Sequence, residues 1–242
     1  MYYRMKWSAF YLAFIWAIAS QAPSSIAFAD VNDGTPMLPQ GKNATALVDK
    51  LIGRVNSLDC YKFDASLEAR TGNKTSKASG TFYFKPTNAV RVEVKKYGSK
   101  SGSILVRSQD GKIRGKGGPQ MMGMKMTLSP DSRLLRMPNG LSAVECDLGS
   151  LLKKLRKEAG SGLKLVSTEQ PMQIEGLGTR AIVIESQRTD DASDAVVDRV
   201  YIDPSQKLPL QWDMFENGKF WSRSKFQNFQ SNMHLDDSEF SL

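Results

Sequence analysis

The chain has 242 residues, of which 40% are hydrophobic and 24% charged, and its formal net charge is +8 at pH 7. Without the leader described next, this is the length of one ordinary domain, and it suffices to bury a sizeable core. The basic residues are spread along the chain with no recognisable nucleic-acid-binding motif, so we expect no nucleic acid partner. Weak attraction of such a surface to anionic lipid or polymer stays open.

Residues 1–29 have the layout of a cleavable secretory signal. Arg4 and Lys6 form a short basic region, an uncharged run of about 13 residues follows, and Ala27-Phe28-Ala29 supplies the small residues that a signal peptidase requires. The run is too short to span ~30 Å of hydrocarbon as a helix, and no cysteine closely follows it as a lipid-attachment site. We therefore expect export to the periplasm of a chain that starts near Asp30, with an uncleaved N-terminal anchor as the alternative.

After the leader, the sequence predicts a segment of low order and then a helix. Residues 30–43 are rich in Pro, Gly and Asn, which predicts a flexible segment. Within residues 44–58 the apolar positions recur every three or four residues, which places them on one stripe of a helix. These positions are Leu47, Leu51, Val55 and Leu58.

From residue 61 onward the period of the apolar residues changes to two. Between 61 and 69 they alternate with polar residues, which is the pattern of a strand with one buried face and one solvated face. Turn residues such as Gly72-Asn73 and Asn217-Gly218 separate further segments of this kind and indicate an antiparallel meander. The further strands are expected at 81–85, 90–95, 103–107, 112–115, 125–129, 133–137, 163–168, 180–187, 196–203, 209–216 and 219–229.

A second helix is expected within the meander. Ser142 and Glu145 fit a capping box, in which each side chain bonds the backbone N–H of the other residue at the start of a helix. An apolar stripe then continues to Glu158 and consists of Val144, Leu148, Leu151, Leu152 and Leu155. The pattern therefore predicts a helix over residues 142–158.

Together these elements define an α+β fold with a single domain over residues 44–242. About ten strands in one antiparallel sheet curl strongly, because every strand is twisted. Two amphipathic helices then bury their stripes against the concave face, which gives a half-open β-barrel. Such an arrangement can leave an apolar cavity between the sheet and the helices.

Nothing in the sequence supports an enzyme. The chain contains a single histidine, His234, in a polar stretch, and it lacks the Gly-x-Ser-x-Gly, P-loop and His-Glu-x-x-His motifs. We expect no catalytic residue, no cofactor and no metal site.

Two features allow more than one interpretation. Four methionines within six residues fit plain packing, an adaptable lipid-facing flap or a copper(I) site, because thioethers are flexible and soft. They are Met121, Met122, Met124 and Met126. Cys60 and Cys146 either pair in an oxidising compartment or stay free, and their spacing is neither that of a metal site nor that of a redox pair.

Several short segments lie in an order known from one protein family. Gly80-Thr81-Phe82-Tyr83-Phe84-Lys85-Pro86 and then Arg91-Val92-Glu93-Val94 form a strand, a basic residue before a proline, and the next strand. Asp110-Gly111-Lys112 marks a hairpin, and Asp203-Pro204 precedes Leu208-Pro209-Leu210. In this order the segments resemble the LolA/LolB superfamily, periplasmic carriers that ferry lipoproteins to the outer membrane. The family's carrier has an arginine before the proline that holds a lid shut, and Lys85 takes that place here.

The resemblance implies a soluble monomer that binds a lipid or an acylated protein and contacts envelope membrane proteins transiently. Its cavity would be lined by Phe63, Leu67, Phe82, Phe84, Val92, Val94, Leu148, Leu152 and Trp212. Its lid or rim would include Lys85, Arg91, Met121, Met122, Met124 and Met126. The alternative is a non-catalytic envelope protein that binds an anionic polymer or a partner domain through a basic rim.

Overall fold

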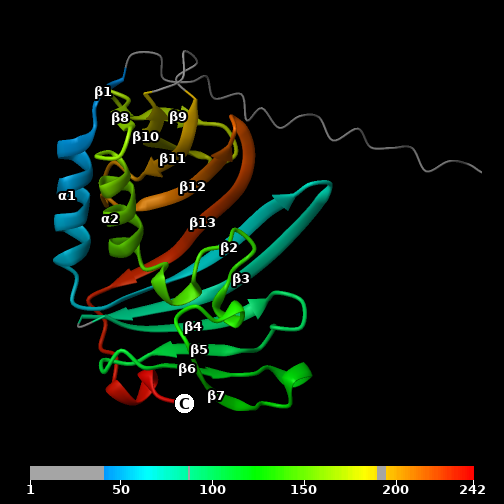
Figure 1. Ribbon diagram of the computed structural model, residues 1–242. Helices are drawn as coiled ribbons and strands as arrows, with labels where there is room; N and C mark the ends of the chain where they lie inside the picture. Colours follow the sequence, from blue (N-terminus) through cyan, green and yellow to red (C-terminus); the bar gives the residue numbers. More distant parts are fainter. Residues whose placement is uncertain (1–40, 87, 190–194) are drawn as a thin grey trace, which may run out of the picture. The chain divides into compact units, whose positions relative to one another are not determined.

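The computed structural model describes residues 41–86, 88–189 and 195–242 (Figure 1). The expected signal at residues 1–29 and most of the expected flexible segment lie outside these ranges. The described residues form one compact unit, to which every element named below belongs. No helix within the described ranges is long and apolar enough to cross a bilayer.

One antiparallel sheet of 13 strands makes up most of the fold. Its order is β1-β8-β10-β11-β12-β13-β2-β3-β4-β5-β6-β7, and β9 pairs with β10 beside this path. Because β1 and β7 stand at opposite edges, the sheet is open. The strands are β1 Lys42–Asn43, β2 Tyr61–Thr71, β3 Lys74–Lys85, β4 Ala89–Lys96, β5 Ile104–Arg107, β6 Ile113–Lys116, β7 Lys125–Leu128, β8 Leu163–Ser167, β9 Met172–Ile174, β10 Thr179–Arg188, β11 Val196–Ile202, β12 Pro209–Glu216 and β13 Lys219–Ser231.

The sheet confirms the predicted antiparallel arrangement but has more strands than the ten or so expected. The short strands β1 and β9 are too brief to show alternation, and β1 includes Lys42 and Asn43 of the expected flexible segment. The strand expected at 133–137 is wrong. A 3₁₀ turn forms instead at Arg133–Leu135, because Ser132 Oγ accepts a hydrogen bond from the backbone N–H of Leu134 at 3.3 Å.

Two α-helices, α1 (Thr45–Asn56) and α2 (Leu148–Glu158), lie side by side (Figure 1). In α1 the predicted stripe residues Leu51 and Val55 are buried, whereas Leu47 is half buried. The first predicted helix is thus present within a few residues of its expected bounds.

The capping box predicted for the second helix is wrong. Ser142 makes no capping hydrogen bond and precedes a 3₁₀ turn at Ala143–Glu145. The helix begins after Asp147, whose carboxylate accepts a hydrogen bond from the backbone N–H of Ser150 at 2.9 Å. A carboxylate at this position bonds the first free N–H groups and carries the charge that the helix dipole favours there.

One hydrophobic core joins both helices to the inner face of the sheet. Strands from β8, next to one edge, to β7, at the other edge, contribute to the same cluster of buried side chains as α1 and α2. Because every strand is twisted, a sheet of this many strands curls, and the bend of the long strand β13 is visible in Figure 1.

The C-terminal residues 232–242 cover the outer face of β3 to β5. Lys85 Nζ donates a hydrogen bond to the carbonyl oxygen of Leu235 at 2.8 Å. A second, smaller apolar cluster forms beneath this segment, with the buried members Cys60, Ala89, Val106, Leu235 and Phe240. Part of the outer face is thus also buried from solvent.

Charges of alternating sign cross the outer face in one row. The cross-strand partners along β10, β11, β12, β13, β2 and β3 are Glu185, Arg199, Asp213, Arg223, Glu68 and Lys77. Arg199 Nη2 lies 2.8 Å from Glu185 Oε1, and Arg223 Nη2 lies 2.7 Å from Asp213 Oδ2. Each carboxylate in this row lies opposite an arginine or a lysine on every neighbouring strand of the row. A shift of register would separate these opposite charges, so the row favours a single register.

Asp64 ties β2 to three other strands on the outer face. It accepts hydrogen bonds from Thr81 Oγ1 at 2.6 Å, Lys95 Nζ at 2.7 Å and Asn228 Nδ2 at 2.9 Å. These bonds, that of Lys95 foremost, lower the pKa of Asp64 to about 2 from its ordinary 3.8. Because the folded state holds the charged form, this stabilisation is present above about pH 4 and is lost as the pH falls toward about 2.

We predict that Asp64→Asn lowers the free energy of unfolding at neutral pH and makes it less dependent on pH between about 4 and 2. Urea unfolding at a series of pH values measures this. The matched control is Asp131→Asn, which removes one exposed carboxyl group. If the Asp64 variant loses stability with acid as steeply as the native chain, the carboxylate does not hold the strands in this way.

Candidate ligand cavity

A hollow lies between the inner face of the sheet and a cover formed by residues 134–143 and α2. Its cavity volume is about 80 Å³, and the empty space between its lining atoms is about 970 Å³ when the part open to solvent is included. Its apolar floor includes Phe63, Ala65, Leu67, Ala78, Gly80, Phe82, Val92, Val94, Leu105, Trp212 and Phe226. Its apolar cover includes Leu134, Leu135, Met137, Leu141, Ala143 and Leu151.

The hollow exists because small residues interrupt the inner face of β2 and β3. Phe63 and Phe82 are cross-strand partners whose stacked rings lie 5.2 Å apart, whereas the next inward-facing pair is Ala65 and Gly80. A Cβ atom on Gly80 would lie 2.6 Å from the carbonyl oxygen of Glu93. Glycine therefore permits both the close approach of β4 and the register shift at this point.

A partly buried lysine ties the cover to the loop after β4. Lys100 Nζ donates to the carbonyl oxygens of Arg133, Leu134 and Arg136 at 3.3, 3.3 and 3.1 Å. It also lies 4.9 Å from the centre of the Tyr97 ring. Burial lowers the pKa of Lys100, because the charged form loses water. The cover is thus held by hydrogen bonds to one side chain as well as by apolar contacts.

One side of the hollow, at β11 and α2, is polar. Asp198 is 3% exposed and accepts hydrogen bonds from Trp212 Nε1 at 2.8 Å and Ser186 Oγ at 3.1 Å. Burial raises the pKa of Asp198 despite these bonds. Burial, followed by the charge of Asp198, also raises the pKa of Glu158, which lies 3.7 Å from Lys154 Nζ. This side can therefore hold a proton or accept a polar group.

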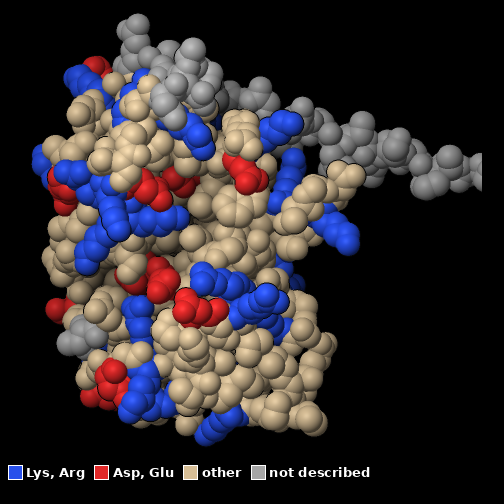
Figure 2. Space-filling model, in the orientation of Figure 1, with Lys and Arg blue, Asp and Glu red and all other residues tan. Residues whose placement is uncertain are grey.

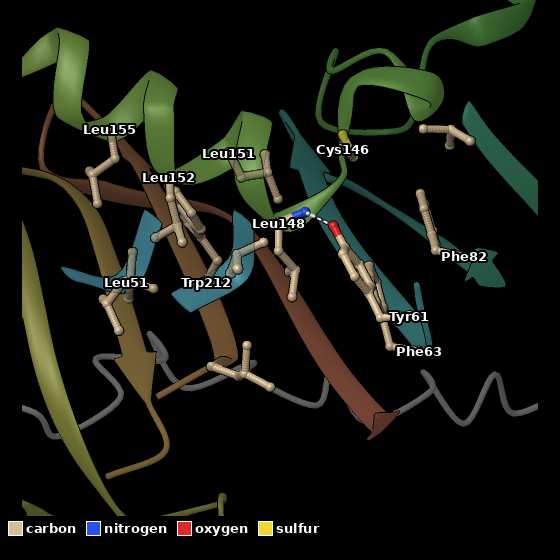
Figure 3. Close-up of a cluster of buried hydrophobic side chains, with 14 of the residues drawn as sticks. Leu51, Tyr61, Phe63, Phe82, Cys146, Leu148, Leu151, Leu152, Leu155 and Trp212 are labelled. Carbon is tan, nitrogen blue, oxygen red and sulfur yellow. Dashed lines mark hydrogen bonds between the residues drawn. The ribbon is translucent and has the colours of Figure 1, made fainter. Parts of the chain in front are cut away.

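Six of the nine residues predicted to line the cavity do line the hollow, namely Phe63, Leu67, Phe82, Val92, Val94 and Trp212. Phe84, Leu148 and Leu152 lie in the core beside it. Figure 3 shows Leu148 and Leu152 projecting from α2 into this core, where the backbone N–H of Leu148 donates to Tyr61 Oη at 3.1 Å. Leu151 lines the hollow in their place, because the stripe alone does not say which of its leucines face a cavity.

Two residues predicted for the lid stand on the wrong face of the sheet for that role. Lys85 Nζ lies 2.7 Å from Asp237 Oδ1, and Arg91 Nη1 donates to the carbonyl oxygen of Glu239 at 2.8 Å. Both bonds hold the C-terminal segment on the outer face. The basic residue before Pro86 therefore latches the chain's end and does not close the hollow, a pairing that no local pattern indicates.

The four methionines divide into two pairs. Met121 and Met126 line a smaller pocket beside the hollow. Met122 and Met124 are exposed. The structure therefore does not gather the four sulfur atoms on one side of the loop.

Sequence reasoning missed the small floor residues and the cover. Ala65, Ala78 and Gly80 stand at inward-facing positions of the predicted strands, so the alternation itself contains the signal that the inner face is hollow there. The cover at residues 134–143 has no regular pattern, and the role of Lys100 depends on contacts more than 30 residues away along the chain.

The two cysteines are free in the structure, contrary to the possible disulfide. Cys60 lies in the cluster under the C-terminal segment on the outer face, whereas Cys146 lies in the main core on the inner face. The two thiols therefore lie in separate apolar clusters. Burial raises the pKa of Cys60 and raises that of Cys146 to about 12, which leaves both thiols protonated and unreactive.

Other candidate chemistry is sparse in the described ranges. His234 is exposed and lies 3.0 Å from Asp236 Oδ1. No group of three or more His, Cys, Asp and Glu side chains in those ranges could hold a metal ion.

The structural class is an open, curled antiparallel sheet with an apolar hollow under a cover of loop and helix. No protein-family model matches the chain, and no curated protein matches it in sequence. Among solved structures, it is similar to a LolA superfamily protein from Nitrosomonas europaea, which is 10% identical and matches over 83% of this chain and 98% of that one, with a TM-score of 0.41. That protein belongs to the superfamily that the sequence resembles.

Two further structures show the same degree of likeness. An uncharacterised conserved protein from Thermus thermophilus is 14% identical over 80% of this chain and 92% of that one, with a TM-score of 0.48. A chain of the Pseudomonas aeruginosa MucA/MucB complex is 12% identical over 82% of this chain and 60% of that one, with a TM-score of 0.42. At these identities and TM-scores the likeness concerns the fold and carries no argument about function.

We predict that Asp198→Asn removes a pH-dependent loss of stability. The raised pKa of the folded carboxyl stabilises the protein fully below the ordinary pKa of 3.8, and this contribution is lost as the pH rises through the folded pKa. The free energy of unfolding of the native chain minus that of the variant should therefore fall as the pH rises from about 4. Denaturant unfolding measures it, with Asp131→Asn as the control. A difference that rises with pH is the contrary result.

Proposed function

We propose that this chain is an exported, non-catalytic carrier that binds a lipid or an acylated protein by holding acyl chains in the hollow, and that it acts as a monomer. The observation that carries the proposal is the apolar hollow between the sheet and its cover. Aromatic and aliphatic side chains line most of it, and a few polar and charged groups stand among them. This composition is the one that small-molecule sites use to bury an apolar ligand and orient its polar part.

The size of the hollow limits how a ligand is held. The cavity of about 80 Å³ is smaller than the roughly 300–1,000 Å³ of typical ligand sites, so a long acyl chain fits only if the cover moves. Each buried CH₂ group contributes about 0.8 kcal/mol, so a chain of several such groups repays the loss of the hydrogen bonds between Lys100 and the cover. We therefore expect the segment 134–143 to shift when a long acyl chain binds.

Purification from the native envelope, solvent extraction and mass spectrometry test the proposal directly. A lipid or an acylated protein should copurify in stoichiometric amount. A dye that fluoresces in apolar surroundings should bind the delipidated chain and be displaced by a fatty acid. A chain that carries no lipid and takes up no dye contradicts the proposal.

We predict that Ala78→Trp fills the hollow and weakens dye and fatty-acid binding by about tenfold or more. Ala78 is half buried, lines the hollow and faces Leu67 on the neighbouring strand. The matched control is Thr75→Trp, at an exposed position of the same strand. Equilibrium dye titration and circular dichroism of both variants separate a filled site from an unfolded protein. Equal affinities for the two folded variants would place binding elsewhere.

A further inference from the structure

The connection between β6 and β7 presents two methionines to solvent. Met122 is 84% exposed and Met124 is 54% exposed, and they are the large hydrophobic residues that stand exposed in the described part of the chain. Exposed apolar side chains on a monomeric protein are normally single and scattered. Here two lie on one turn, so both can meet a partner at once.

The turn, residues 117–124, has a defined backbone that holds them outward. The N–H of its first residue donates to the carbonyl oxygen of its last at 2.8 Å. A Cβ atom on Gly118 would collide with the carbonyl oxygen of Ser101, so this glycine lets the turn pack tightly on the loop after β4. Met122 has a φ of 52°, a left-handed conformation that a residue with a Cβ atom rarely adopts. The turn therefore holds the backbone at Met122 in one uncommon conformation.

Two lysines stand at the base of the turn. Lys116 ends β6 and Lys125 begins β7, and the two exposed residues are direct cross-strand partners. Like charges in this position destabilise a sheet. Neither side chain forms an ion pair or a hydrogen bond within the described ranges. An anionic partner would relieve the repulsion between them.

We propose that this turn is a membrane contact, in which Met122 and Met124 enter the apolar edge of an anionic bilayer while Lys116 and Lys125 bind lipid phosphate groups. Apolar side chains in front of basic ones match the depth profile of a bilayer surface. Flexible thioethers adapt to varied acyl chains. Figure 2 shows no red over this end of β6 and β7, so acidic groups do not oppose anionic headgroups on that face.

The turn also adjoins the hollow. The smaller pocket lined by Met121 and Met126 shares Val94, Leu105 and Leu134 with the hollow. The transfer of a ligand from the bilayer through this pocket to the hollow rests on the proposed function. The membrane contact itself does not depend on what fills the hollow.

Cosedimentation with vesicles tests the contact. The full exported chain should bind vesicles of phosphatidylglycerol and phosphatidylethanolamine, and bind phosphatidylcholine vesicles far more weakly. The double variant Met122→Ser/Met124→Ser should lower the affinity for anionic vesicles by about tenfold. Lys116→Gln/Lys125→Gln should lower it at low salt and reduce its salt dependence. If the native chain fails to bind anionic vesicles, the proposal is overturned, and the exposed methionines would instead indicate a contact with a protein partner.

A dye at a single position locates the contact. Met122→Cys labelled with an environment-sensitive dye should shift its emission to the blue with anionic vesicles, whereas a dye at the exposed Gln206 in the β11–β12 turn should not. Both native cysteines are buried, so labelling is selective. Equal shifts at the two positions overturn the proposal. Ala78→Trp separates the membrane contact from the proposed function. If this variant has lost dye uptake but still binds vesicles at the native level, the result supports the membrane contact.

Discussion

The uninterrupted pairing of β2 with β3 decides where the hollow forms. Their 11 cross-strand pairs, from Tyr61 and Phe84 at one end, keep a single register without a bulge. In this register the stacked rings of Phe63 and Phe82 come directly before the small pair that opens the hollow. Because side chains alternate along a strand, a slip of one residue would turn all of these inward positions to the outer face and bring charged residues in. Everything inside the sheet depends on that register.

The outer face specifies the register of the neighbouring strands by a different interaction. The pair of Glu185 and Arg199 is almost wholly buried, and removal of one partner from such a pair costs about 3–5 kcal/mol. The pair of Lys77 and Glu68 at the other end of the row is much more exposed and contributes about 0–1 kcal/mol. The magnitudes therefore place the constraint on β10 to β13, and three of these strands, β11, β12 and β13, line the hollow with their inner faces. The aromatic stack then constrains β2 and β3.

Local patterns predicted the elements that local forces decide. Alternation along β2 and the apolar stripe of α1 follow from side-chain period alone, so both were predictable. The start of α2 was not, because two acidic or hydroxylic caps, Ser142 and Asp147, compete within a few residues and only the folded core selects between them. In the site, aromatic residues indicate the walls, while the empty space depends on small residues and on an irregular cover. The partner of Lys85 lies 152 residues further along the chain, so no local pattern could exclude this lysine from a lid.

The hollow is asymmetric, and its asymmetry is arranged along the sheet order. Asp198 on β11 marks the polar side, whereas Leu105 on β5 marks the apolar side, several strands away. Beyond β5 the same apolar surface continues past Leu134 into the smaller pocket and reaches the turn between β6 and β7. Lys100 also lines both the hollow and the smaller pocket, where its ammonium group is bound to carbonyl oxygens of the cover. In the function that we propose, the acyl tail of a ligand would lie toward the turn between β6 and β7, and its polar end would lie against Asp198, where burial favours the protonated carboxyl group.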